Sequence, residues 1–237
     1  MSARRIGLLG GTFDPIHCGH IDVAEAAQAA LDLGRMLLIT ANIPPHRERP
    51  VASPFQRYAM VVLAVGKRSN WRASDMELRS GEPSYTSTTL ARFHERGYTR
   101  TELFFILGAD AFADIAAWRD YPAIFDAAHF VVVSRPGASV NAIPERVPAI
   151  AGRMTFKATD VAAATQPLIF LIDAPTADVS ASAIRAKCAA GESIAGLVPP
   201  LVQQYIEQQG LYGPRDRQRR SADAPRSTPA GRLHGQD

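Results

Sequence analysis

Cysteine is scarce in this chain: only Cys18 and Cys188 occur among its 237 residues, far apart and in unlike surroundings. Two such residues suggest no disulfide framework. No apolar run approaches the roughly 18 residues of a membrane-spanning helix, and residues 1–5 lack the apolar stretch of a secretory signal. The sequence therefore predicts a cytoplasmic protein without a membrane partner.

The two best-known nucleotide-binding signatures are also missing. No segment fits G-x-x-x-x-G-K-[ST], which excludes a P-loop enzyme, and the first glycine turn lacks the G-x-G-x-x-G typical of dehydrogenases. A zinc centre is equally unsupported, because His17, His20 and His46 have no cysteine or carboxylate cluster to complete a ligand set. No protein-bound metal is predicted.

A basic surface spread over the whole chain is lacking too, although 26 basic and 23 acidic residues give a net charge of +3. The whole excess lies after residue 212, where six arginines accompany three aspartates. Gly, Pro, Ser and Arg dominate this stretch, so residues 213–237 are predicted to be a disordered basic tail that follows one domain of residues 1–212. A nucleic-acid partner is not expected.

What the chain does have is a glycine-rich turn between an apolar run and an alanine-rich amphipathic segment. Residues 10–20 are GGTFDPIHCGH, and they follow the apolar residues 6–9. This order predicts a strand, a turn and a helix N-terminus, whose unpaired backbone N–H groups and partial positive charge bind anions. His17 and His20, three residues apart, would project from one side of the first helical turn. The pattern predicts a polyphosphate site.

Strand and helix signals alternate along the rest of the chain. The predicted strands are 6–9, 36–40, 76–78, 103–107, 129–134, 154–158 and 168–172, and the predicted helices are 20–33, 55–65, 87–96, 111–116, 180–190 and 198–209. Gly34 is predicted to end the first helix and Ser53 to cap the second, while residues 44–47 and 137–153 are interpreted as loops. Such alternation predicts an α/β fold with a doubly wound parallel sheet, whose ligands bind beyond the carboxyl ends of the strands.

A second anion site is predicted at the start of the helix 180–190. Ser180 and Ser182 are suited to cap that helix, and Arg185 on the next turn is suited to hold the same anion as a bidentate fork. Because most of the distinctive glycine, histidine and arginine residues follow predicted strands, we expect them at one rim of the sheet.

These two segments together resemble the paired signatures of the nucleotidyltransferases with an H-x-G-H motif. Further short segments occur in the same order as in the bacterial nicotinate-nucleotide adenylyltransferases: residues 44–47 (PPHR), 83–86 (PSYT), 108–110 (GAD), Trp118 and 134–137 (SRPG). The resemblance extends from about residue 5 to residue 212 and implies a Rossmann-like nucleotidyltransferase fold. Arg47, where lysine is also common, and Val179 and Ala181, where Ile and Ser are usual, are mild departures.

The resemblance implies transfer of the adenylyl group of ATP, with Mg²⁺, to nicotinate mononucleotide, releasing pyrophosphate. No covalent intermediate on the protein is needed, because the phosphate monoester of the acceptor is already a nucleophile. His17 and His20 would be the catalytic residues, with His20 nearest the transferring phosphorus, and Asp110 would accept hydrogen bonds from the ribose. The implied ATP-binding residues are Gly10, Gly11, Thr12, His17, His20, Gly108, Asp110, Ser180, Ser182 and Arg185.

For the mononucleotide, the resemblance implies a second set of residues: Thr12, Phe13, His46, Arg47, Tyr85, Thr86, Trp118, Arg119 and Arg135. Trp118 would stack on the pyridine ring, while Tyr85 and Thr86, with the backbone amide of Arg119, would bind its carboxylate. Nicotinamide mononucleotide would leave these donors unpaired, so a preference for the acid is expected.

Several of these residues also have a structural interpretation. Trp118 is compatible with a core position and Arg135 with a plain surface position, and Asp14-Pro15 is interpreted as a turn. Two other functions stay open: transfer of an adenylyl or cytidylyl group to phosphopantetheine, FMN or glycerol phosphate, and nucleotide sensing without catalysis. Association into a homo-oligomer is compatible with the sequence.

Overall fold

The computed structural model describes residues 5–43 and 49–214 of the chain. Its framework is one seven-stranded sheet in the order β3-β2-β1-β4-β5-β7-β6, in which every strand pairing is parallel. The strands are β1 (Ile6–Gly11), β2 (Arg35–Thr40), β3 (Trp71–Ser74), β4 (Leu103–Gly108), β5 (His129–Val133), β6 (Met154–Thr155) and β7 (Ile169–Ile172). The predicted parallel sheet is therefore confirmed.

The chain enters this sheet at β1, beside the central strand β4. It runs from β1 to β2 and β3 on one side, then returns to β4 beside β1 and continues to β5, to the edge strand β6, and finally to β7 between β5 and β6. The order of strands thus reverses between β1 and β4, and the carboxyl ends of these two strands border the crevice where doubly wound folds bind ligands. The fold itself therefore directs attention to the segment after β1.

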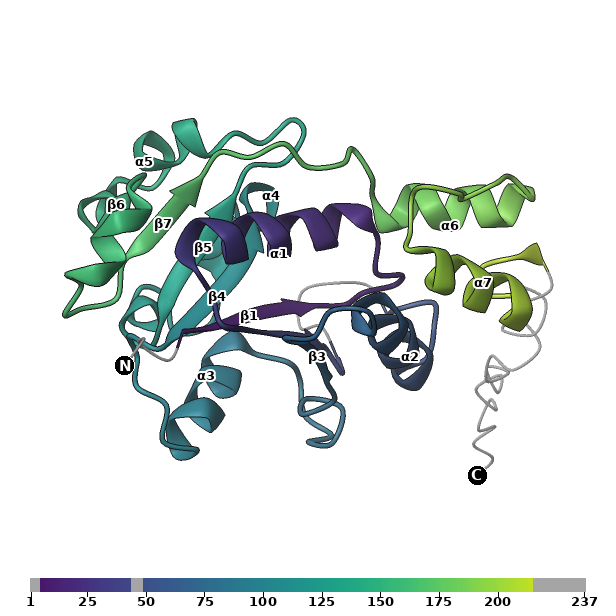
Figure 1. The fold of residues 1–237 in the computed structure, drawn as a ribbon, viewed down its shortest axis with the longest axis horizontal. Helices are drawn as coiled ribbons and strands as arrows, with labels where there is room; N and C mark the ends of the chain where they lie inside the picture. The colour runs from purple at the N-terminus through teal and green to yellow at the C-terminus, as the bar shows by residue number, and fades with distance from the viewer. Residues whose placement is uncertain (1–4, 44–48, 215–237) are drawn as a thin grey trace, which may run out of the picture.

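Helices cover both faces of the sheet (Figure 1). They are α1 (Cys18–Leu31), α2 (Pro54–Val65), α3 (Thr86–Glu95), α4 (Ala109–Phe112), α5 (Ile143–Arg146), α6 (Ala181–Ala190) and α7 (Pro200–Gln209), with 3-10 turns at Ile115–Ala117, Ala123–Asp126, Val140–Ala142, Pro148–Arg153 and Ala158–Ala162. In Figure 1, α1 lies along one face above β1, α3 lies on the opposite face, and α6 and α7 lie together beyond the carboxyl end of β1. No helix in the described ranges has the length and apolarity needed to cross a bilayer.

Alternate residues of the central strands feed two separate apolar cores. Phe104 and Ile106 of β4 join the core under α1, α2, α6 and α7, whereas Phe105 and Leu107 join the core under α3 and α4. This is the two-residue period of a strand whose two faces are both buried. It explains why β4 is apolar throughout.

The second helix begins as its sequence predicts. Ser53 Oγ accepts a hydrogen bond from the Gln56 N–H, the Gln56 side chain accepts one from the Ser53 N–H, and Pro54 occupies the first turn. The first helix differs at both ends: it begins at Cys18 rather than residue 20, and it ends at Leu31 with Asp32 in the left-handed conformation, φ 50°. The predicted role of Gly34 as its stop was wrong.

Two predicted strands were also wrong in place or length. Residues 76–78 form turns, and the edge strand is instead β3, which pairs with β2 and buries Trp71. The predicted strand 154–158 has only two residues, because Thr155 Oγ1 accepts from the Lys157 N–H and turns the chain after β6. The predicted loop 137–153 contains α5 and two 3-10 turns. The predicted tail, residues 215–237, lies outside the described part of the chain.

Candidate active site

The glycine turn after β1 leads directly into α1, as the sequence predicts. Gly10 and Gly11 are the last residues of β1, and His17, with an extended backbone, caps α1. Between them Phe13 takes a left-handed conformation, φ 50°, which is unusual for a bulky residue and costs conformational energy. Its ring is almost completely buried, so packing compensates for the strained backbone. The turn at the crevice between β1 and β4 is therefore fixed in one conformation by the buried Phe13 ring.

The two histidines of this turn lie against each other. Their ring centroids are 3.7 Å apart, and the edge of the Phe13 ring meets the His20 ring at 5.1 Å. The backbone N–H of His17 donates to Nδ1 of His20 at 3.3 Å. Because Nδ1 accepts this bond, the proton of a neutral His20 ring is on Nε2, which makes Nε2 a hydrogen-bond donor.

His17 is more deeply buried than His20. Burial, reinforced by the positive charge of Arg135, lowers the pKa of His17 to about 4. Its Nδ1 faces the first turn of α1 but has no hydrogen bond of standard geometry to any residue that the structure describes. His17 is therefore a neutral ring whose Nδ1 has no hydrogen bond within the described residues. It stands at the start of α1, where the sequence predicts an anion site.

Acidification is expected to destabilise the folded chain through its buried histidines. The pKa values of His17 and His129 are both lowered to about 4, mainly by burial, whereas an unfolded chain protonates histidine near pH 6.5. The unfolded state therefore binds more protons between these values, and the free energy of unfolding should fall by about 1–2 kcal/mol per histidine between pH 7 and pH 5. Urea unfolding at both pH values should show a smaller fall for His129→Gln than for the wild type; an identical fall would contradict this expectation.

The side chain of Arg135 passes between Gly19 and Gly108. A Cβ atom on Gly19 would overlap the Arg135 guanidinium and lie 3.2 Å from the Ala177 carbonyl oxygen, and one on Gly108 would lie 3.0 Å from Arg135 Cγ. The guanidinium donates to the Val179 carbonyl oxygen at 3.0 Å. The glycine of the H-x-G-H motif is thus required for the close approach of this arginine. Arg135 is a partly buried residue of the site rather than a plain surface residue.

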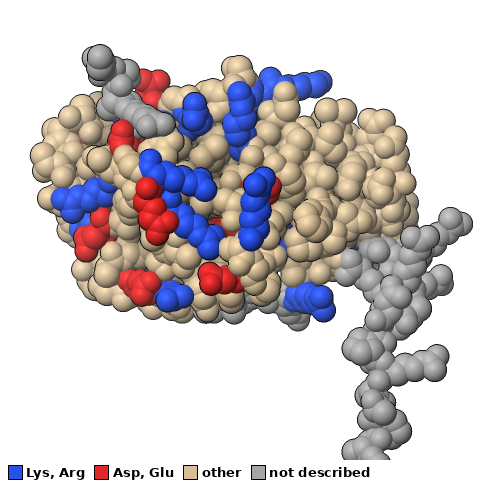
Figure 2. All heavy atoms as spheres, turned by 90° about the horizontal axis from the view of Figure 1, so that it is seen from below, with Lys and Arg blue, Asp and Glu red and all other residues tan. Residues whose placement is uncertain are grey.

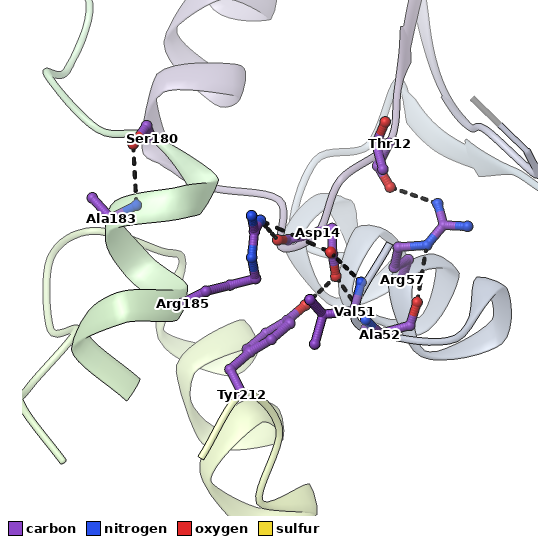
Figure 3. A network of polar contacts seen from close by, with 9 residues as sticks. All are labelled: Thr12, Asp14, Val51, Ala52, Arg57, Ser180, Ala183, Arg185 and Tyr212. Carbon is purple, nitrogen blue, oxygen red and sulfur yellow. Dashed lines mark hydrogen bonds and ion pairs between the residues drawn. The ribbon is translucent and has the colours of Figure 1, made fainter. Parts of the chain in front are cut away.

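Arg185, in the second turn of α6, reaches Asp14 of the glycine turn, as Figure 3 shows. Ser180 caps α6, since its Oγ accepts from the Ala183 N–H at 3.2 Å, while the neighbouring Ser182 is exposed. Arg185 donates from Nη1 to the backbone carbonyl oxygen of Asp14 at 2.8 Å. Two helix N-termini distant in sequence, those of α1 and α6, therefore border one region with Arg185 between them.

A second group of predicted residues gathers around α3. Tyr85 caps this helix with an extended backbone, Thr86 is its first residue, and the Arg119 guanidinium lies 4.8 Å from the centroid of the Tyr85 ring. Trp118 is partly buried, and its ring meets Phe105 edge to face at 6.1 Å. Trp118 therefore packs on the core with part of its surface accessible, so the structural and the ligand-stacking interpretations are compatible.

The remaining predicted residues fall at the carboxyl ends of the strands or outside the described ranges. Gly108 caps α4, and Asp110 in the first turn of α4 is exposed with Oδ1 close to Gly108. Thr12 directly follows β1. His46 and Arg47 lie outside the described residues. Arg135 also helps to line an open hollow of about 560 Å³ at the ends of β5 and β7, formed by residues 134–139 and 173–176.

Three residues of the site were missed by sequence reasoning: Asp14, Arg57 and Tyr212. Asp14, interpreted as part of a turn, is buried and accepts from the Val51 and Ala52 N–H groups and from the Tyr212 hydroxyl. Arg57 is completely buried in α2. Its guanidinium donates to four backbone carbonyl oxygens, those of Thr12, Ala41, Asn42 and Ala52. The only local signal was a charged residue among the apolar positions of a helix.

The charged surface of the molecule is mixed in sign on the face shown in Figure 2. Lysine and arginine side chains there stand beside aspartate and glutamate, and they form no continuous basic patch. Ion pairs such as Arg79–Asp75 and Arg92–Glu82 occur at the surface. Within the described ranges, no group of three or more His, Cys, Asp or Glu side chains is arranged to hold a metal ion. Arg135 and Arg185 bring positive charge to the glycine turn from other segments, while the carboxylate of Asp14 is buried within it.

Comparisons with known proteins agree with this geometry. A family model described as cytidylyltransferase-like matches residues 8–187. A probable nicotinate-nucleotide adenylyltransferase of Desulfatibacillum aliphaticivorans is 41% identical over 217 residues, covering 88% of this chain and 99% of that protein. The chain belongs to the nicotinate-nucleotide adenylyltransferase family. A further member, from Escherichia coli (strain UMN026), is 35% identical over 206 residues, covering 86% of this chain and 97% of its own.

Solved structures with the same fold extend the comparison. The nicotinic acid mononucleotide adenylyltransferase of Plasmodium falciparum, in a complex with NaAD, superposes with a TM-score of 0.68 over 88% of this chain and 97% of its own, at 20% sequence identity. At this identity the likeness establishes the fold, and it confirms the Rossmann-like nucleotidyltransferase fold implied by the sequence. The family resemblance based on the H-x-G-H segment is confirmed as well.

Proposed function

We propose that this chain transfers the adenylyl group of ATP to nicotinate mononucleotide, giving deamido-NAD and pyrophosphate. The observation that carries the proposal is the contact between Arg185 and the glycine turn, which joins the N-termini of α1 and α6 into one anion-binding region. Helix N-termini with backbone N–H groups and an arginine fork suit a polyphosphate. The family of the chain supports the same reaction.

The reaction needs no nucleophile from the protein. An oxygen of the acceptor 5′-phosphate attacks the α-phosphorus of ATP, a new P–O bond forms, and the bond to the β-phosphate oxygen breaks, so that the electron pair leaves with pyrophosphate. Catalysis then consists of aligning two anions and stabilising the charge of the in-line transition state. In this scheme His17 and His20 both contact the ATP phosphates, and Nε2–H of His20 donates to the transferring phosphate.

The proposed ATP site uses both helix N-termini. Ser180, Ser182 and Arg185 bind the β- and γ-phosphates, Gly10, Gly11 and Thr12 line the α-phosphate, and Asp110 beside Gly108 binds the ribose. An open hollow at the ends of β5 and β7, which Arg135 helps to line, lies beside this region. Mg²⁺ carried on the ATP phosphates would neutralise their charge.

The proposed mononucleotide site lies toward α3. Trp118 stacks on the pyridine ring, and the start of α3 at Tyr85 and Thr86 binds its carboxylate. Arg119 stacks on Tyr85 and so holds positive charge close to this position. Phe13 and Arg135, with His46 and Arg47, complete the proposed set. On the grounds given by the sequence, the proposed location of the enzyme is the cytoplasm.

The direct test is an assay of the full-length chain with ATP, Mg²⁺ and either pyridine mononucleotide. We expect deamido-NAD and pyrophosphate in equal amounts, and a kcat/KM for nicotinate mononucleotide at least about 100-fold above that for the amide, because the amide cannot satisfy donors placed for a carboxylate. Phosphopantetheine, FMN and glycerol phosphate with ATP or CTP serve as control acceptors. Comparable kcat/KM for the acid and the amide, a faster control acceptor, or no release of pyrophosphate would overturn the proposal.

A further inference from the structure

The last described residues of the chain end against the glycine turn. After α7, Gly210 and Tyr212 both take left-handed conformations, φ 61° and 62°, and Leu211 and Tyr212 are buried. The Tyr212 hydroxyl donates to Oδ1 of Asp14 at 2.9 Å, across 198 residues of sequence. Figure 3 shows Tyr212 and Arg185 approaching Asp14 from two different segments. Tyr212, close to the end of the described residues, thus helps to hold the turn that contains Asp14.

Three hydrogen bonds hold the carboxylate of Asp14 in place. Oδ1 accepts from the Ala52 N–H at 2.9 Å and from Tyr212, and Oδ2 accepts from the Val51 N–H at 2.7 Å. Because the carboxylate is almost fully buried, these three donors replace the hydrogen bonds that water makes to an exposed carboxylate. Burial, with the adjacent negative charge of Asp14, raises the pKa of Tyr212, which therefore remains a protonated donor.

Arg185 contacts the same residue at a different atom. Its Nη1 lies 2.8 Å from the Asp14 carbonyl oxygen but 3.8 Å from the carboxylate oxygen Oδ2. The guanidinium is therefore docked on the turn without a direct hydrogen bond to the carboxylate. Its side chain is 30% exposed, and among the described residues Asp14 is its one hydrogen-bond partner. The other N–H groups of the fork remain available for an anion.

We propose that Tyr212 is a positioning residue for Arg185. The inference rests on the proposed function, in which Arg185 binds the β- and γ-phosphates of ATP. Because the Tyr212 hydroxyl satisfies Oδ1, the carboxylate does not need the guanidinium as a donor. Without that hydroxyl, Asp14 is left with one donor fewer in a buried place, and the nearest cation with mobile donors is Arg185. The fork then turns to the carboxylate and fewer of its N–H groups reach the phosphates.

The test is Tyr212→Phe, which removes one oxygen atom and keeps the buried ring. We expect the KM for ATP to rise about 5- to 10-fold, the scale of one hydrogen bond of ordinary net strength, with the KM for nicotinate mononucleotide changed less than about twofold. The matched control is Tyr205→Phe in α7, where the ring is half-buried against the same core. A purely structural role would lower the Tm and leave both KM values unchanged, and that result would overturn the inference.

A binding measurement separates this inference from the proposed reaction. Inorganic pyrophosphate is titrated calorimetrically into the wild type, Tyr212→Phe, Arg185→Ala and the double variant. We expect Tyr212→Phe to weaken binding about 5- to 10-fold in the presence of Arg185 and hardly at all in its absence, because the hydroxyl acts through the arginine. Additive losses would overturn the inference. If the wild type binds pyrophosphate with this coupling but forms no deamido-NAD, the proposed reaction fails and the positioning role stands.

Discussion

Replacing His20 by alanine is expected to lower kcat by about 10²–10³, the scale for removal of one transition-state donor. The His17 backbone N–H binds Nδ1 of His20, and the Phe13 ring packs against the imidazole, so Nε2–H is held in a fixed direction. A donor held in this way needs little reorganisation when charge develops on the transferring phosphate. The KM values should change less than kcat, since the contact is strongest in the transition state.

Steady-state kinetics with both substrates, on protein whose folding is checked by its Tm, measures this effect. The matched control is His94→Ala on α3, where Nδ1 of His94 lies 2.9 Å from the Tyr98 carbonyl oxygen. That variant should keep kcat within about twofold of the wild type, because this partly buried side chain lies at the other end of α3 from Tyr85 and Thr86. A fall of less than about fivefold in His20→Ala would mean that the role of His20 in charge stabilisation is wrong.

Replacing Arg57 by methionine is expected to lower the free energy of unfolding by about 3–5 kcal/mol, the scale for breaking a buried charged network. Methionine has a similar length and no donors, so the variant leaves four backbone carbonyl oxygens without their buried partner. It also removes a positive charge close to the buried Asp14. These carbonyls belong to the ends of β1 and β2 and to the start of α2, so the loss affects the wall of the site.

Urea unfolding of the wild type and Arg57→Met measures the loss. The matched control is Arg79→Met, since Arg79 is 77% exposed and pairs with Asp75 at the surface. Exposed pairs of this kind contribute about 0–1 kcal/mol. If Arg57→Met costs no more than Arg79→Met, the buried guanidinium does not support the turn as its hydrogen bonds indicate.

The parts of the site that are local in sequence could be predicted. The segment GGTFDPIHCGH contains its own strand end, turn and helix start, and the structure arranges it in that order. Ser180 likewise caps the helix that follows it. In such segments the chemistry depends on neighbours within a few residues, so spacing alone is informative.

The supporting contacts could not be predicted, because they join distant segments. Tyr212 meets Asp14 across 198 residues, and Arg57 reaches back to Thr12 across 45. In sequence, Arg57 is a charged residue among the apolar positions of a helix, but nothing nearby indicates its partners, and Asp14 has the pattern of a turn former. The short edge strand β3 was missed for a similar reason: its four residues include the polar Arg72 and Ser74, and pairing with β2 decides its conformation.

The hydrogen bond between Asp14 and Tyr212 also bears on the order of synthesis. β1 is the first strand to be synthesised, yet the turn that follows it receives one of its hydrogen-bond donors from Tyr212, almost two hundred residues later. A chain that stops before Leu211 therefore lacks the phenol that completes this turn. Truncated products of translation would contain the whole H-x-G-H segment, but Asp14 would lack the hydrogen bond that Tyr212 donates.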